Sequence, residues 1–459
     1  MFISIKKTIP SQNRGKLFFS TSSFSDNKKL LQFLLVSMMV FLTISLNATN
    51  YYVSSSGNDS NAGTSENTPW KTLAKVNSFT PKPGDQILFK RGEEWTGSIT
   101  VNASGTSSSR ITYGAYGTGD NPKIYGSEVI TGWTKHSGNI YKASFNTSIN
   151  QLFLNNSRMK AARHPNTGYL STTTINSTSS FTCDALNSSI NYIGATWVGR
   201  TVAFATVTLK VVSSSGRTLT LSEAPYANLN TNEGFILVNK LEFLDTAGEW
   251  YYDNNSKTVY FWTPNGDTPG NYTVSGSTND NGIVITGKNY ITVENLEILN
   301  HKKYGISLSG NYITIDNNII TNPDSRGIDI SLGSYCNISN NLVTGPNHSG
   351  IFTYSSNCII SDNQVNDIFL FNNIGISGGG AWYMGSGISV EGNDNTVKYN
   401  RVLNTGYNGI CFYKRNVIEY NYVKNALLTK DDGGGIYTAA AGTYPNAPTA
   451  GSIIRNNIV

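Results

Sequence analysis

The sequence predicts an all-β protein, a right-handed parallel β-helix whose coils repeat about every 22 residues. Two phrases recur in step. A Gly-Ile pair opens seven alternating segments, at Gly282, Gly305, Gly327, Gly350, Gly387, Gly409 and Gly435. An Asn-x-(Ile/Val) phrase begins at Asn318, Asn341, Asn363, Asn400, Asn421 and Asn457. A coil of this length cannot bury its own apolar face, so neighbouring coils must stack. Parallel strands joined by crossovers are almost always right-handed.

The repeated positions predict two columns of apolar side chains inside the solenoid. The first column holds Ile306, Ile328, Ile351, Ile388, Ile410 and Ile436. The second holds Ile298, Ile320, Val343, Val365, Val402, Val423 and Val459. The asparagines fall at turns, where each is expected to hydrogen-bond the equivalent Asn of the next coil. A leucine-rich repeat has a similar period, but its Leu-x-x-Leu-x-Leu phrase is absent from the sequence.

Residues 1–48 are predicted to be an export leader. Lys28 and Lys29 precede an uncharged apolar run from Leu30 to Leu46, and Ala48 offers a cleavage point. The alternative is a membrane anchor, since the run is close to a marginal span. The leader carries the whole net charge of +5. The rest of the chain is balanced, so nothing suggests nucleic acid as a partner. We expect a secreted monomer that is free of the membrane after cleavage.

Residues 49–126 are expected to form an N-terminal cap and the first coils. Tyr51 to Val53 reads as a strand, and Pro69 to Asn77 as a short helix that covers the open end of the solenoid. Residues 127–277 lose the coil period and are read as an antiparallel β insertion, with strands such as Thr201 to Leu209. Residues 278–459 hold the regular coils. Because the chain stops inside a coil, its C-terminal end is interpreted as truncated.

The four cysteines do not indicate a disulfide framework in a chain of this length. Cys336 and Cys358 are one coil apart, so they are expected to stack as buried thiols. Adjacent strands lie ~4.8 Å apart, which is wider than the Cβ separation of a disulfide. Cys411 follows a coil-opening glycine by two residues, and its side chain is expected to point outward.

Function in a solenoid is expected in the loops that break the period. Two long insertions, between Val365 and Gly387 and between Val423 and Gly435, leave the same turn of their coils. They should project from one edge, together with polar and aromatic side chains of the other coils. The expected substrate-binding residues are His301, Arg326, His348, Trp382, Tyr383, Tyr407, Asn408 and Tyr437. Aromatic rings and carboxylates along an elongated groove suit a polysaccharide.

The phrase from Lys430 to Thr438 stands out within this edge. Asp431 and Asp432 precede three glycines, which combines crowded charge with close approach of the backbone. We expect Asp432 to be catalytic, or Asp431 if the register differs by one. Glu391 and Asp329 are the candidates for a second carboxylate. Taken singly, an Asp or Asn at a β-helix turn is more often a turn former.

Several phrases resemble a known family. The opening Tyr51-Tyr-Val-Ser, with Gly57-Asn-Asp59 and Pro69-Trp70, resembles the N-terminal segment of secreted bacterial proteins with the pectin-lyase-like β-helix. The phrases from Gly248 to Trp262 and from Asp432 to Thr438 resemble β-helical glycoside hydrolases. The resemblance implies a catalytic role for Asp432 and a second catalytic carboxylate, which could lie beyond Val459.

Three functions stay open at this point. The first is a glycoside hydrolase that cleaves plant or algal polysaccharide with a carboxylate pair and no cofactor. The second is a polysaccharide lyase, in which Asp431 and Asp432 would hold Ca²⁺ and Lys430 or Arg415 would abstract a proton. The third is a glycan-binding surface protein without catalysis. The sequence does not distinguish the sugar or the linkage.

Overall fold

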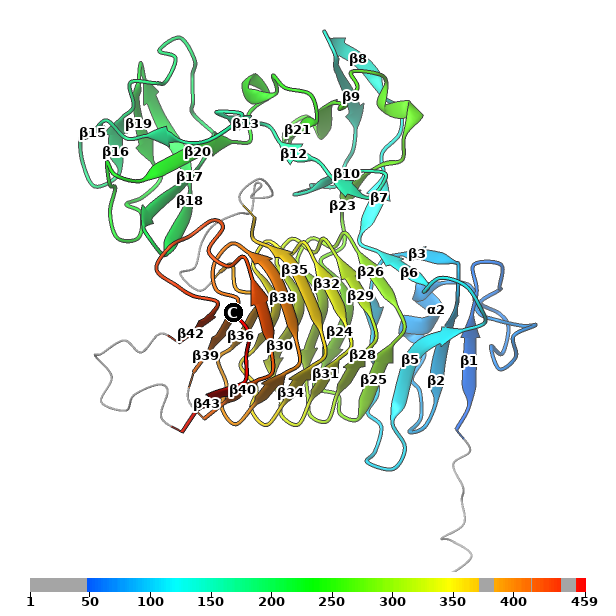
Figure 1. Cartoon of the computed structure of the whole chain (residues 1–459). Coiled ribbons are helices and arrows are strands. Elements are labelled where there is room, and N and C mark those ends of the chain that lie inside the picture. Colours follow the sequence, from blue (N-terminus) through cyan, green and yellow to red (C-terminus); the bar gives the residue numbers. More distant parts are fainter. Residues whose placement is uncertain (1–47, 371–383, 414, 439–450) are drawn as a thin grey trace, which may run out of the picture. The chain divides into compact units, whose positions relative to one another are not determined.

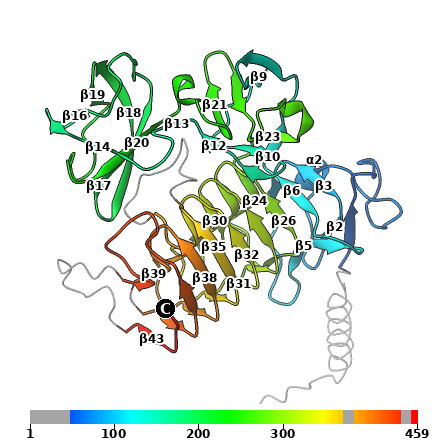
Figure 2. The ribbon, with the colours of Figure 1, turned by 45° about the horizontal axis from the view of Figure 1, so that its top comes forward.

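The computed structural model describes residues 48–370, 384–413, 415–438 and 451–459. All of them belong to one unit, Ala48–Val459. Its central part is a right-handed coil of three parallel sheets, A, B and C, and each coil of the chain adds one strand to each sheet (Figure 1). The predicted β-helix is therefore confirmed. Figure 2 shows the strands of successive coils stacked side by side.

The strands of the three sheets are short and regularly spaced along the chain. Sheet A consists of β1 (Asn50–Val53), β2 (Gln86–Lys90), β5 (Ile111–Tyr116), β25 (Ile291–Glu294), β28 (Thr314–Asp316), β31 (Asn337–Ser339), β34 (Ile359–Ser361), β37 (Thr396–Lys398), β40 (Val417–Glu419) and β43 (Ile453–Arg455). Sheet B consists of β3 (Glu94–Thr96), β6 (Lys123–Tyr125), β26 (Glu297–Leu299), β29 (Ile319–Thr321), β32 (Leu342–Thr344), β35 (Gln364–Ile368), β38 (Arg401–Thr405) and β41 (Tyr422–Lys424). Sheet C consists of β4 (Ile99–Thr100), β24 (Asn281–Thr286), β27 (Tyr304–Ser309), β30 (Arg326–Leu332), β33 (Ser349–Thr353), β36 (Ile388–Val390), β39 (Ile410–Phe412) and β42 (Ile436–Tyr437).

The two apolar columns lie where the repeat predicts them. The strand register pairs the isoleucines of sheet C from Ile283 to Ile436, and the branched residues of sheet B from Ile298 to Val423. Val459 is exposed but keeps its place in the second column, since a Cβ on Gly435 would lie 2.2 Å from Val459 Cγ1. The glycine before each isoleucine has a packing reason. A Cβ on Gly305 would lie 2.3 Å from Ile320 Cγ2, so a larger residue would displace the second column.

The asparagine ladder is confirmed from Asn318 to Asn457. Each Oδ1 accepts hydrogen bonds from the backbone N–H and the side-chain amide of the preceding ladder residue, at 2.8 to 3.1 Å. The Nδ2 group also donates to backbone carbonyls, such as Ile338 O for Asn363. These amides are buried up to Asn421. Their hydrogen bonds satisfy backbone groups that the turns would otherwise leave unpaired.

The N-terminal helix is shorter than predicted. Helix α2 runs from Leu73 to Ser78, with the Thr72 hydroxyl accepting from Lys75 N at its start. Pro69 does not begin it, because the adjoining Trp70 continues the backbone pairing of β1 through a bridge to Val53. Trp70, Leu73 and Val76 are nevertheless all buried in the solenoid core. Within the described residues, no helix is long and apolar enough to cross a membrane.

The stretch between β6 and β24 leaves the coil and forms further sheets. One sheet contains β7 (Ser127–Val129), β10 (Leu152–Leu154), β11 (Ser157–Arg158) and β23 (Val274–Ser277). A second contains β8 (Thr134–Ser137), β9 (Ile140–Ser144), β12 (Lys160–Ala161), β21 (Glu249–Asp253) and β22 (Thr258–Trp262). A third contains β13 (Arg163–His164), β14 (Leu170–Ser171), β15 (Thr174–Ile175), β16 (Ser180–Thr182), β17 (Thr196–Val202), β18 (Ala205–Ser215), β19 (Thr218–Leu221) and β20 (Gly234–Val238). Two short 3₁₀ helices are η1 (Leu241–Phe243) and η2 (Pro269–Asn271).

Strand pairs in this insertion are antiparallel apart from β12 with β21, which run parallel. The single strand predicted from Thr201 to Leu209 is wrong. The chain instead turns at residues 203–204, between β17 and β18, and the two strands pair as a hairpin. The insertion has its own apolar clusters, one of which packs Phe181, Trp197 and Phe235 together.

The cysteines are all free thiols and all buried. Cys336 and Cys358 lie one coil apart as buried thiols, as the spacing predicts, and their Sγ atoms donate to backbone carbonyls. The expectation for Cys411 is only half right. Its side chain is on the outer face of sheet C, between Ser389 and Tyr437, yet it is only 4% exposed. The outer face of this sheet is therefore covered.

Candidate active site

The outer face of sheet C carries one row of chemically active side chains. The register pairs Asp329, Phe352, Ser389, Cys411 and Tyr437 in successive strands. The first four are buried, and Tyr437 is partly exposed. The row predicted from the repeat thus exists, but most of it lies beneath other side chains. The ionisable side chains that reach solvent, Glu391 and Asp432, lie at the two ends of the strands.

Glu391 lies just after β36 and is held by hydroxyl groups. The Ser389 Oγ donates to its Oε1 at 3.0 Å, and the Tyr413 hydroxyl forms a second hydrogen bond. Burial raises the pKa of Glu391, although both hydrogen bonds and the charge of Arg326 oppose that shift. Glu391 is partly exposed. A carboxyl group with a raised pKa that reaches solvent has the properties expected of a general acid.

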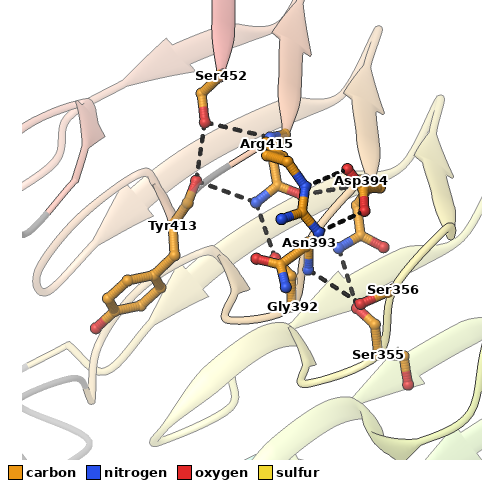
Figure 3. A network of polar contacts seen from close by, with 10 residues as sticks. Ser355, Ser356, Gly392, Asn393, Asp394, Tyr413, Arg415 and Ser452 are labelled. Atoms are coloured by element: carbon orange, nitrogen blue, oxygen red, sulfur yellow. Dashed lines mark hydrogen bonds and ion pairs between the residues drawn. The ribbon is translucent and has the colours of Figure 1, made fainter. Parts of the chain in front are cut away.

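The backbone around Tyr413 is fixed by a network at the next turn (Figure 3). The Tyr413 carbonyl accepts from Asn416 Nδ2 and Ser452 Oγ, both at 3.1 Å. Arg415 makes a bidentate ion pair with Asp394 at 2.8 and 2.9 Å. The Tyr413 ring points away from these contacts. Arg415 therefore stabilises the turn through its ion pair with Asp394, whereas the Tyr413 hydroxyl interacts with Glu391.

Asp432 is positioned by a buried tyrosine from the previous coil. The Tyr407 hydroxyl donates to the Asp432 carbonyl at 2.9 Å, and the next residues close on Asn408, whose Oδ1 accepts from Gly434 N at 3.0 Å. A Cβ on Gly433 would lie 2.4 Å from Asn408 Oδ1. The close approach that the three glycines predict is real at Gly433. The Asp432 side chain is exposed, and its φ is +58°.

The two neighbouring aspartates have different surroundings. The Asp431 carboxylate makes an ion pair with Arg200 of the insertion at 2.8 Å, and Asp431 N donates to the Ala203 carbonyl at 2.8 Å. The charge of Asp432 instead acts on Tyr407 and Tyr437, where it helps to raise the pKa of each phenol. Asp431 is therefore bound to the insertion, whereas Asp432 lies near the tyrosines of sheet C.

Cys411 lies between the two candidate carboxylates. Burial raises the pKa of Cys411 to about 12, and the charge of Glu391 adds to that shift. Cys411 also helps to raise the pKa of Tyr407 and Tyr437, the two phenols whose pKa the charge of Asp432 raises. The two rings have centroids 6.2 Å apart. Glu391 follows β36 and Asp432 precedes β42, so the two carboxyl groups lie at opposite ends of the strands of sheet C.

Asp329 is engaged by a neighbour within a buried cluster. Arg326 pairs with the Asp329 carboxylate, and its guanidinium lies 3.5 Å from the ring centre of Phe352. Arg326 Nη2 also contacts His348 Nε2 at 3.4 Å, while His348 Nδ1 is 2.8 Å from Ser349 Oγ. Burial and the nearby cations Arg326 and Lys430 hold the pKa of His348 well below its usual value. Arg326, Asp329 and His348 thus form a buried cluster of mutually paired side chains, which packs under the outer face of sheet C.

Lys430 is a fully buried amine directly before the two aspartates. Its Nζ donates to the Met384 carbonyl at 2.9 Å and lies 5.1 and 5.3 Å from the ring centres of Phe369 and Tyr407. Burial lowers the pKa of Lys430 to about 7. The amine therefore anchors the loop from within, and the cation–π contacts compensate part of its lost hydration.

One of the expected binding residues, His301, is not at this surface. His301 is buried among the first coils, with Nε2 3.3 Å from the Gly97 carbonyl, and burial lowers its pKa to about 4. Trp382 and Tyr383 lie outside the described residues. In the portion of the chain that the structure describes, no group of three or more His, Cys, Asp or Glu side chains is arranged to hold a metal ion.

Sequence reasoning missed the residues that the insertion and the turns bring to the site. The Arg200 contact with Asp431 spans 231 residues, and the insertion has no repeat that could predict it. The hydrogen bond from Tyr413 to Glu391 was also missed. A weak signal existed there, because Tyr413 and Glu391 follow Gly409 and Gly387 by the same four residues. Equal positions in adjacent coils are neighbours.

Comparisons with known proteins agree with this fold. A family model described as a right handed beta helix region matches residues 259–413. Over 86 residues the chain is 43% identical to the lacto-N-biosidase of Bifidobacterium longum subsp. longum. That alignment covers 18% of this chain and 5% of the biosidase, so the chain corresponds to a small part of that relative.

Two solved structures share the architecture over most of the chain. One, described as a glycoside hydrolase, has a TM-score of 0.68 at 14% identity and covers 89% of this chain and 96% of its own. The xylose complex of XylC has a TM-score of 0.53 at 14% identity and covers 85% and 65%. The protein is therefore a right-handed parallel β-helix protein that resembles β-helical glycoside hydrolases in its fold.

Proposed function

We propose that this protein is a secreted glycoside hydrolase that cleaves plant or algal polysaccharide with Glu391 and Asp432. The observation that carries the proposal is the contrast between the two groups. Glu391 has a raised pKa and is held by Ser389 and Tyr413, whereas Asp432 is exposed and lies at the other end of the strands of sheet C. Two carboxyl groups in unlike environments are the requirement for glycoside hydrolysis.

In the proposed reaction Glu391 is the general acid, and Asp432 is the nucleophile or the general base. The protonated Glu391 donates to the glycosidic oxygen while the bond from that oxygen to the anomeric carbon breaks. Asp432 acts on the opposite side, either as base for the attacking water or as nucleophile at the anomeric carbon. In the second case water then hydrolyses the glycosyl ester on Asp432, with the deprotonated Glu391 as base. The products are two saturated sugars with a new reducing end. The local likeness to lacto-N-biosidase supports a carbohydrate substrate.

The first experiment screens the protein against a panel of plant and algal glycans. Wild type is compared with Glu391→Gln, Asp432→Asn and the control Asp394→Asn, an exposed carboxylate of the Arg415 turn. We expect new reducing ends from wild type and the control, and a loss of roughly 10²-fold or more in the two site variants. Full activity in both site variants would refute the assignment.

A polysaccharide lyase is the second candidate, and Lys430 is the observation that favours it. An amine with a pKa of about 7 can accept a proton at neutral pH. Its burial and its contact with Met384 place it under the surface, which favours the hydrolase. Unsaturated products that absorb in the ultraviolet and disappear with a chelator would establish the lyase. Binding without any product would establish a glycan-binding protein.

Export is part of the proposal and has its own test. The basic residues and apolar run before Ala48 support a cleaved leader, after which the chain would begin at Thr49. Mass spectrometry of the protein from the culture medium should give a mature N-terminus close to Thr49. Recovery of full-length chain in the membrane fraction would indicate an anchor instead.

A further inference from the structure

The insertion brings a second set of side chains to the loop that carries Asp432. Arg200 of β17 pairs with Glu233 through Nε and with Asp431 through Nη1, the latter at 2.8 Å. The Ala203 carbonyl, at the tip of the β17–β18 hairpin, accepts from Asp431 N. These contacts join the insertion directly to the backbone next to Asp432. Whatever occupies the surface at Asp432 therefore meets the insertion on one side.

Tyr169 lies at the same place on the insertion. Tyr169 precedes β14, which pairs with β20, and Glu233 directly before β20 holds Arg200. The Tyr169 side chain crosses Gly234 of β20, where an added Cβ would lie 2.7 Å from Tyr169 Cβ. The residue is 53% exposed. A half-exposed aromatic ring held against a strand is a rigid platform with little conformational entropy to lose.

We propose that Tyr169, Arg200 and Asp431 form a distal sugar subsite, which binds a neutral pyranose unit next to the unit cleaved at Asp432. This inference rests on the proposed function and adds the class of substrate to it. The tyrosine would stack on the sugar ring. The guanidinium would donate to sugar hydroxyls, and the Asp431 carboxylate, whose side chain is 64% exposed, would accept from them.

The balance of charge selects a neutral sugar over a uronate. One guanidinium lies between the two carboxylates of Glu233 and Asp431, so the subsite carries one net negative charge. A uronate carboxylate would meet that charge and be repelled. Sugar hydroxyls both donate and accept hydrogen bonds, so they can accept from the Arg200 guanidinium and donate to the Asp431 carboxylate. The subsite therefore favours neutral chains of three or more units over oligouronides.

The test measures binding, so that it does not depend on turnover. The full chain carrying Asp432→Asn is titrated calorimetrically with xylo-, cello- and galacto-oligosaccharides and with oligogalacturonides, each of two to six units. We expect a neutral series whose affinity rises with length beyond two units, and weaker binding of the oligogalacturonides. In Tyr169→Ala the gain with length should fall by about fivefold or more. The matched control is Tyr335→Ala, which is also 53% exposed but stacks on Tyr312 in a turn between coils.

A second variant tests the charge argument. Asp431→Asn removes the net negative charge, so its affinity for oligogalacturonides should rise relative to the neutral series. The subsite would be overturned by a gain with length that survives Tyr169→Ala, by equal losses in both tyrosine variants, or by no binding to any oligosaccharide. The proposed function is judged separately, by hydrolysis with Asp432 intact. Hydrolysis without a Tyr169 effect would remove only the subsite.

Discussion

At the scale of single residues, the surroundings of Glu391 decide its protonation. Burial raises the pKa, while Ser389, Tyr413 and Arg326 each lower it, and burial outweighs the three together. The group therefore stays protonated to a higher pH than an exposed glutamate. As the general acid it must be protonated, so activity should fall on the alkaline side as pH rises through this pKa.

The first prediction concerns Tyr413→Phe. Loss of a hydrogen bond that lowers the pKa of Glu391 should raise that pKa further, so the alkaline limb of the profile of kcat/KM against pH should move to higher pH. Tyr420→Phe, an exposed tyrosine that stacks on Tyr399 in another turn, serves as the control. If the alkaline limb of Tyr413→Phe stays at the same pH or moves to lower pH, Glu391 is not the acid whose titration is observed.

The second prediction concerns the buried amine of Lys430. Its pKa is about 7 in the folded protein against an ordinary value of 10.5, so the unfolded chain binds more protons between these limits. This residue should therefore make stability rise with pH from about 7 to about 10.5. In Lys430→Met this contribution should vanish, which denaturant unfolding at pH 7 and pH 10 would measure. Equal pH dependence in both proteins would contradict the assignment.

At the scale of elements, the asparagine ladder links each coil to the next. The Asn363 side chain donates to Ile338 O, Ser361 O and Asn400 Oδ1, and its Oδ1 accepts twice from Asn341. Because all of these groups are buried, the ladder cannot lose one member without leaving several polar atoms unpaired. The ladder therefore fixes the register of adjacent coils.

The third prediction is the cost of breaking this ladder. Asn363→Leu should lower the free energy of unfolding by at least ~3 kcal/mol, since each unsatisfied buried group costs ~1–3 kcal/mol. The control is Asn425→Gly, an exposed turn residue with a φ of +58° that glycine tolerates. That change should cost less than ~1 kcal/mol. Similar losses for both variants in chemical denaturation would show that the ladder adds no special stability.

At the scale of the whole molecule, a buried polar contact joins the insertion to the coils beside the site. Arg158 donates to the Gly345 carbonyl at 2.9 Å and to Asn347 Oδ1 at 3.4 Å. Asn150 and Asn347 hold the buried Asp324 carboxylate at 2.6 and 2.8 Å. Since Asn347 adjoins His348, the insertion braces the same coil that supports the buried Arg326 cluster.

The fourth prediction tests this brace with Arg158→Met. Removing one partner from a buried charged cluster should destabilise the protein by about 3 kcal/mol or more. The melting temperature should fall, and limited proteolysis should cut the insertion sooner. Arg217→Met, at the exposed turn before β19, is the matched control and should leave both readouts unchanged. An Arg158 variant that behaves like this control would show that the contact does not hold the insertion.

The repeat alone was enough to predict much of this molecule. The glycine and asparagine phrases specify the coil, both apolar columns and the ladder, because stacking places equal positions of successive coils together. The same reasoning placed Asp329, Phe352, Ser389, Cys411 and Tyr437 in one row. It did not predict that four of them are buried, since burial depends on what covers the outer face.

The tertiary structure decided which residues of the candidate site are exposed and how they are charged. Asp431 and Asp432 are adjacent in sequence, yet only the former is paired with Arg200 of the insertion. The raised pKa of Glu391 follows from burial and from hydroxyls that the coil register delivers. A period encodes neighbours one coil apart, whereas contacts with the insertion join distant parts of the chain that share no pattern. The sequence therefore determined the scaffold, and the packing of the insertion and turns against that scaffold determined the site.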